Sequence, residues 1–225
     1  PSLNLNIELN LNNGFVTTQG SFAFHEACQN GHKDVVQLLL DQPGLNLNIE
    51  LRLRGNEEGI TQGWVALFAA CRNGHKDVVQ LLLDDSERID LNARNLSGWT
   101  ALMYACSNGH KDVVQLFLDN SKRIDLNARD NYGRTALMLA CCTRNARKRN
   151  ARKKDVVQLL LNHSDPRIDL NAKDVNGNTA LMIAQQKSIV KLIKAKLNQM
   201  EAPQKPMHQM MTRQKTKMIK AKLNQ

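Results

Sequence analysis

The chain has 225 residues, of which 42% are hydrophobic and 23% charged, and its formal net charge is +10. No run of about 20 apolar residues occurs, so we expect no membrane-spanning helix. The first 15 residues lack the basic and apolar segments of a secretory signal, and we therefore expect a cytoplasmic or nuclear protein. The chain begins with Pro1 rather than methionine, which leaves open whether it is a fragment.

The N-terminal region contains two similar alternating segments. Residues 3–11 and 45–53 alternate apolar and polar side chains, and Asn13-Gly14 follows the first segment. A period of two is typical of strands with one buried face, and Asn-Gly is a strong signal for a tight hairpin. We predict two enlarged hairpin fingers over 3–18 and 45–62 that lie side by side. An untied end over 1–12 is the open alternative, because chain ends are often disordered.

Two sequence blocks recur along the chain. One reads GHKDVVQLLL at 31–40 and 74–83, GHKDVVQLFL at 109–118 and KKDVVQLLL at 153–161. The other precedes it and starts at Phe22, Val65, Thr100, Thr135 and, in a fifth copy, Thr179, with steps of 43, 35, 35 and 44 residues. Such a period indicates stacked repeats. Two insertions of about eight residues lengthen the first and last steps, and we expect both of them in loops.

Residues 95–129 illustrate one unit. Thr100 is suited to begin a helix, because its hydroxyl can accept a backbone N–H of the first turn. Gly109 is suited to end that helix in the left-handed conformation. A second helix follows, and its apolar run from Val113 to Leu118 predicts burial on most sides. Stacked neighbours can bury this surface whereas a lone helix pair cannot, so these runs are expected to supply most of the stability.

The segments GWTALMYACSNGHKDVVQLFL (98–118) and GRTALMLAC (133–141) resemble the ankyrin repeat. The resemblance covers about residues 14–199. It implies an all-α repeat solenoid, a stack of five antiparallel helix pairs with β-hairpin fingers. We expect the solenoid over 1–199, in units of about 1–42, 43–94, 95–129, 130–173 and 174–199, with a basic loop insertion at 143–154 and a basic, flexible tail at 200–225.

The sequence departs from the family pattern at two repeat positions. Alanine replaces the family's proline after threonine at Ala101, Ala136 and Ala180. Phe22 and Val65 replace the capping threonine, so we expect weaker helix starts there.

Cysteine and histidine follow the repeat. Cys28, Cys71, Cys106 and Cys141 recur at one position, which favours buried thiols in a packing seam over a metal site. The resemblance implies a structural role for His32, His75 and His110, through hydrogen bonds to backbone groups. No phosphate-binding loop, HExxH or nucleophile elbow occurs. We therefore expect no enzyme activity, catalytic residue, cofactor or metal.

Positive charge is concentrated in two segments. The first, 144–154, carries +7 without an acidic residue, on Arg144, Arg147, Lys148, Arg149, Arg152, Lys153 and Lys154. It could be a nuclear-import signal, a patch for an anionic partner or a solvated loop without a role. The second, 187–225, carries +9. Its end is either a basic amphipathic helix that binds a membrane or a calmodulin-like partner, or a disordered or marginal tail. The remaining chain carries −6.

The resemblance also implies a binding surface on the concave side, formed by finger tips and first helices. The candidates at the fingers are Trp64, Trp99, Arg134, Asn178, Leu96 and Tyr132. Those on the helices and their ends are Met103, Arg72, Asn73, Ser107 and Asn108. Tryptophan is enriched in interface hot spots, although both tryptophans could instead pack finger against finger.

The prediction is a non-enzymatic, monomeric scaffold that binds a protein partner. One alternative is a nuclear adaptor or transcriptional co-regulator imported through 144–154. Another is a basic tail that targets membrane or nucleic acid while the solenoid binds cargo.

Overall fold

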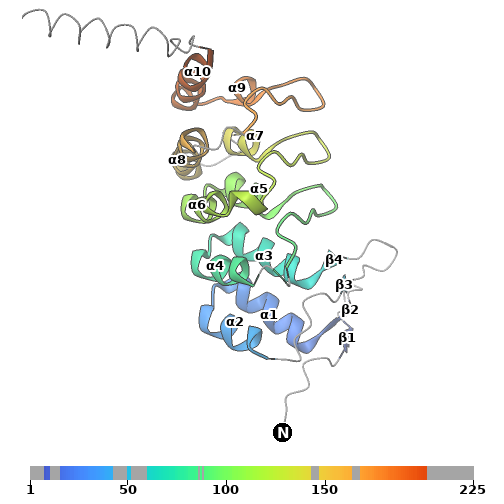
Figure 1. The fold of residues 1–225 in the computed structure, drawn as a ribbon. Coiled ribbons are helices and arrows are strands. Elements are labelled where there is room, and N and C mark those ends of the chain that lie inside the picture. The colour runs from blue at the N-terminus through green and yellow to red at the C-terminus, as the bar shows by residue number, and fades with distance from the viewer. Residues whose placement is uncertain are drawn as a thin grey trace, which may run out of the picture.

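The computed structural model describes residues 8–10, 16–42, 50–51, 60–85, 87, 89–142, 147–163 and 168–201. Its helices follow one another in antiparallel pairs along the chain (Figure 1). The pairs are α1 (Gln19–Asn30) with α2 (Lys33–Leu40), α3 (Gln62–Asn73) with α4 (Lys76–Asp84), α5 (Ala101–Asn108) with α6 (Lys111–Asp119), α7 (Ala136–Cys141) with α8 (Arg147–Asn162), and α9 (Ala180–Ile183) with α10 (Lys187–Glu201). A 3-10 turn, η1 (Ser121–Arg123), follows α6.

The helices form two layers. Each first helix contacts the first helix of the next pair, from α1 through α9, and each second helix does the same from α2 through α10. The turns of the later units project beyond the first-helix layer, as Figure 1 shows. This arrangement is an α-helical repeat solenoid, and that element of the prediction is confirmed.

Strands occur, among the described residues, only ahead of α1 and α3. β1 (Glu8–Asn10) pairs antiparallel with β2 (Val16–Thr18), in a register that places Leu9 opposite Thr17. β3 (Glu50–Leu51) pairs antiparallel with β4 (Ile60–Thr61). The turn at Asn13-Gly14 and most of the second alternating segment lie outside the described residues, as does the expected tail from 202 onward.

The recurring apolar run forms the core. Val36, Val79, Val114 and Val157 occupy one repeat position and are all 0% exposed. Each sits within a helix that packs on both its own partner and its neighbours, so the same valine is buried in every unit that carries it. Burial of a valine or leucine side chain contributes about 1.5–3 kcal/mol, which makes the repeated run a main source of stability.

The first helices begin in two ways. In α5 and α7 the hydroxyl of Thr100 or Thr135 accepts a hydrogen bond from the backbone N–H of Met103 (3.3 Å) or Met138 (3.4 Å). α1 and α3 lack this threonine, and each begins three residues before the position aligned with it, directly after a strand. The missing cap therefore does not shorten these helices.

The insertion in the fourth unit is not the loop expected from the repeat pattern. α2, α4 and α6 begin at the lysine aligned with Lys154, whereas α8 begins at Arg147. The backbone of 147–154 is therefore a helical extension of α8, and α7 is correspondingly short. An insertion at the end of a helix leaves the stacking faces intact, which is why the solenoid accepts it.

None of the described helices is long and apolar enough to span a membrane.

Candidate partner-binding surface

An aromatic cluster spans the second and third units on the first-helix side. Tyr104 of α5 lies between Phe68 of α3 and Trp99, which immediately precedes the Thr100 cap. The ring centroids are 5.1 Å apart for Phe68–Tyr104 and 5.0 Å for Trp99–Tyr104, with interplanar angles of 53° and 58°. These tilted arrangements are favourable for aromatic pairs. Trp99 is half-buried against the core, so its orientation is restrained by packing.

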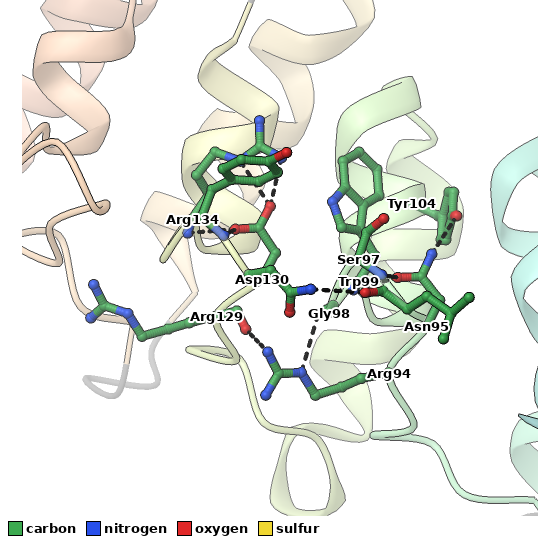
Figure 2. A network of polar contacts seen from close by, with 12 residues as sticks. Arg94, Asn95, Ser97, Gly98, Trp99, Tyr104, Arg129, Asp130 and Arg134 are labelled. Carbon is green, nitrogen blue, oxygen red and sulfur yellow. Dashed lines mark hydrogen bonds and ion pairs between the residues drawn. The ribbon is translucent and has the colours of Figure 1, made fainter. Parts of the chain in front are cut away.

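Asn95 fixes the turn that carries Trp99. Its side-chain oxygen accepts hydrogen bonds from the backbone N–H groups of Ser97 and Trp99, both at 2.9 Å, and its Nδ2 donates to the Tyr104 hydroxyl at 2.9 Å (Figure 2). Gly98 lies within this turn with a φ of +76°, a conformation that favours glycine. The Asn95 side chain thus links this turn to Tyr104 of α5.

Asp130 has the corresponding role in the next unit. Its Oδ1 accepts from the backbone N–H groups of Tyr132 (2.9 Å) and Arg134 (2.8 Å), and its Oδ2 pairs with the Arg134 guanidinium at 2.6 Å. The Arg134 guanidinium carbon lies 4.9 Å from the Tyr132 ring centroid and 5.9 Å from that of Trp99. Asp130 is buried, and its ion pair with Arg134, drawn in Figure 2, restrains the guanidinium beside both rings.

In the fifth unit, Asp174 holds the corresponding turn. Asp174 accepts from the backbone N–H groups of Asn176 and Asn178 and from the Asn178 side chain. These hydrogen bonds, the one from the Asn178 backbone foremost, hold the pKa of Asp174 below its usual value. No aromatic ring accompanies them among the described residues, and Asn178 uses its amide on Asp174.

Two cavities open beside the aromatic cluster. One has a volume of about 540 Å³, the other about 460 Å³, and Arg72, Asn95 and Tyr104 line both of them. We call the combined depression the Tyr104 groove. Its other lining residues are His25, Gln29, Val65, Phe68, Ala69, Asn73, Ser97, Trp99, Ser107, Asn108, Tyr132 and Arg134.

Most of the partner-binding residues predicted from the sequence line this groove. They are Trp99, Tyr132, Arg134, Arg72, Asn73, Ser107 and Asn108. Leu96 is exposed and Asn178 half-buried, and neither is among the groove residues. Trp64 lies in α3, but the structure describes only its backbone. Packing of Trp64 against Trp99 therefore stays a prediction.

The prediction for Met103 is wrong. It was expected on the binding surface, yet it is 0% exposed and belongs to the core. Met182 occupies the same repeat position in the last pair and is 68% exposed. The last pair has no following unit, whereas α5, which carries Met103, packs against α7, so a following unit explains the difference in exposure.

Tyr104, at the centre of the groove, was missed. Its repeat position holds Glu26, Ala69, Leu139 and Ile183 in the other units. The signal was present as a departure from the repeat, since no other unit has an aromatic residue there. Asn95 was missed because turn residues are usually assigned to local structure alone.

The basic run does not form one exposed patch. Arg152 and Lys154 are exposed, but Lys153 is only 5% exposed and its ammonium donates to the carbonyl oxygens of Leu139 (3.3 Å) and Cys142 at the end of α7. Lys153 stands where other units have the histidine of Gly-His, and it acts as a helix cap. Arg144 lies outside the described residues, as do the side chains of Arg147, Lys148 and Arg149.

The histidines of the repeat bridge successive units. Nε2 of His75 lies 2.9 Å from the carbonyl oxygen of Gln29, and Nε2 of His110 lies 2.9 Å from that of Arg72. A carbonyl can only accept, so Nε2 carries the proton in each ring. The structural role expected for these two histidines is confirmed.

The recurring thiols are structural as well. Cys28, Cys71, Cys106 and Cys141 are free and buried, whereas Cys142 is half-buried. Burial raises the pKa of all four buried thiols, that of Cys141 to about 12. The described residues contain no group of three His, Cys, Asp or Glu side chains placed to hold a metal.

The stacked helix pairs define a helical-repeat solenoid. A model of ankyrin repeats in three copies matches residues 3–95 and 67–148, and a model of the single ankyrin repeat matches residues 132–175. The chain belongs to the ankyrin repeat family. No curated protein matches it. Ankyrin repeats generally mediate protein–protein interaction and are non-enzymatic modules.

Proposed function

We propose that this protein is a non-enzymatic interaction scaffold, a five-unit solenoid with projecting fingers that binds one protein partner in the Tyr104 groove. The observation that carries the proposal is the cluster of Phe68, Tyr104 and Trp99 beside two cavities of about 540 and 460 Å³. We further propose that the protein acts as a monomer, in the cytoplasm or the nucleus.

The physical support is preorganisation. Tyrosine, tryptophan and arginine dominate interface hot spots, because they provide a large contact area for few rotatable bonds. Here Asn95 and Asp130 fix the two turns, and Asp130 fixes the Arg134 side chain. A partner would therefore meet side chains that are already ordered and would not have to offset their conformational entropy.

The two alternatives from sequence depend on basic segments. Among the described residues, Lys153 uses its ammonium inside the fold, which removes one cation from the run at 144–154. No described contact distinguishes the rest of the run or the tail as a binding surface. The groove is therefore the better-supported site.

The test is quantitative affinity capture from a lysate with three proteins. They are the unchanged chain, the double variant Trp99→Ala/Tyr104→Ala, and the control Leu38→Ala/Met200→Ala, which removes exposed apolar side chains outside the groove. We expect a partner that the groove variant loses and the control retains, with both variants still folded by circular dichroism.

A partner retained by the folded groove variant but lost on reversing the charges of Arg152 and Lys154 would contradict the proposal. It would assign binding to the basic run instead.

A further inference from the structure

The Tyr104 groove differs in charge from the rest of the solenoid. Its lining contains Arg72, Arg134 and His25, and no aspartate or glutamate among the described residues. Outside the two basic segments, the chain carries a formal charge of −6. The groove lining thus contains no acidic side chain, although the body of the solenoid is acidic.

The two arginines are not equivalent. Arg134 is neutralised by Asp130, which is buried and bonded to it at 2.6 Å. Arg72 is exposed at the end of α3, and no described carboxylate forms an ion pair with it. Because Arg72 is exposed and lines both cavities, it can meet a ligand in either of them.

A second polar group at the groove also lacks a partner. Nδ1 of His25 is buried and forms no hydrogen bond with any described residue. A buried polar atom without a partner costs free energy, and a ligand could recover it only where the His25 ring turns this atom toward the cavity. His25 lines the cavity that Arg72 shares with Phe68.

From this arrangement we infer that the partner enters as an acidic peptide segment that also carries an aromatic or aliphatic side chain. A carboxylate of the segment pairs with Arg72, and the apolar side chain packs on the Phe68–Tyr104–Trp99 cluster. Arginine recognises carboxylates through its planar set of donors, and an interface made of one charged pair beside an apolar anchor gives both specificity and affinity. This inference rests on the proposed function and names the partner's chemistry.

The test is a selection of random peptides displayed on phage, performed on the unchanged chain and on Arg72→Glu. Arg123→Glu is the matched control, because Arg123 is exposed on η1 and its replacement makes the same change in net charge away from the groove. Peptides selected on the unchanged chain should be enriched in Asp and Glu and contain an apolar anchor. Arg72→Glu should weaken these peptides about tenfold or more, and Arg123→Glu should leave them nearly unchanged.

The binding of individual selected peptides then separates two kinds of failure. Peptides that lose binding to Tyr104→Ala, but show no acidic excess and tolerate Arg72→Glu, would overturn the inference and leave the proposed function intact. A selection in which no peptide depends on Tyr104 or Trp99 would contradict the proposed function, and the inference with it.

Discussion

Asn92 and Asp125 lie in successive linkers, and the side chain of the first holds the backbone of the second. Oδ1 of Asn92 accepts from the Asp125 N–H at 2.8 Å, while its Nδ2 donates to the Arg123 carbonyl at 2.9 Å. One amide group thus satisfies two backbone groups of the next unit, as a neighbouring strand would. Asn127 accepts from the Asp169 N–H at 2.9 Å in the same way.

Replacing Asn92 by alanine should lower the free energy of unfolding by about 1–3 kcal/mol, because two backbone groups lose their partner. Urea unfolding would measure the change. Asn176→Ala is the matched control, since Asn176 is exposed and uses its backbone N–H, not its side chain, in the described hydrogen bond. Equal effects of the two substitutions would show that the bridge contributes nothing.

Gly74 and Gly177 offer a matched pair for a steric prediction. Both have positive φ, +81° and +78°, so alanine at either position carries a backbone cost of about 1–2 kcal/mol. A Cβ at Gly74 would overlap the His110 ring, whereas one at Gly177 meets nothing within 4 Å. Gly74→Ala should therefore destabilise the protein more than Gly177→Ala, in thermal unfolding of both variants. Similar losses would mean that the ring moves aside freely.

Val35 and Val78 share one repeat position, yet Val35 is 46% exposed and Val78 only 1%. The preceding helix pair covers Val78, and no described element does so for Val35. Val78→Ala should cost roughly 1–3 kcal/mol through lost burial and the cavity left behind, and Val35→Ala less than about 0.5 kcal/mol. A comparable cost at Val35, by chemical denaturation, would indicate that this face is covered in solution.

His110 predicts a dependence of stability on pH. Burial lowers its pKa below the ordinary 6.5, and the nearby Arg152 and His75 lower it further, against the opposing effect of the hydrogen bond to the Arg72 carbonyl. As the pH falls through 6.5, the unfolded chain takes up a proton that the folded chain does not, so unfolding becomes easier. The loss continues until the pH reaches the lower folded value.

The variant His110→Gln, whose amide can still donate to the Arg72 carbonyl, should show a smaller loss of stability over this range. Urea unfolding at a series of pH values would measure the difference. A slope as steep as that of the unchanged protein would exclude His110 as its source.

Cys142 should be the most reactive thiol among the five cysteines. The thiolate is the reacting form, and burial raises the pKa of Cys28, Cys71, Cys106 and Cys141. Cys142 is half-buried. Alkylation of the native protein, followed by peptide mass spectrometry, should label Cys142 first. Labelling of Cys106 at the same rate would show that the stack opens readily.

The repeat pattern predicted the helical stack because burial follows the period. Val79 and Val114 occupy equivalent environments, so one unit describes its neighbours. The pattern could not locate the groove fully, since a binding residue is a departure from the repeat. Tyr104 stands out only when compared with Ala69 and Leu139 at the same position.

Two other features could not be predicted from the sequence, for a different reason. They are the burial of a residue by a neighbouring unit and the exact end of a helix. Met103 is buried in α5, which packs against α7, and the repeat pattern does not state how far a following helix extends over its neighbour. The sequence predicts a charged surface for Lys153 because it is one of the seven cations of residues 144–154. Its burial depends on where α7 stops and on which carbonyls that end leaves unpaired, both of which are tertiary properties.

The bonds between linkers have a mechanical consequence. Asn92 and Arg94 reach the linker of the next unit, at Asp125 and Arg129, and Arg129 reaches the following linker, at Lys173. Each such bond joins adjacent units, so tension applied to the two ends of the solenoid passes through the interfaces in series. The weakest interface yields first, and the chain then lengthens in steps of one unit, about 35 to 44 residues each, rather than in a single event.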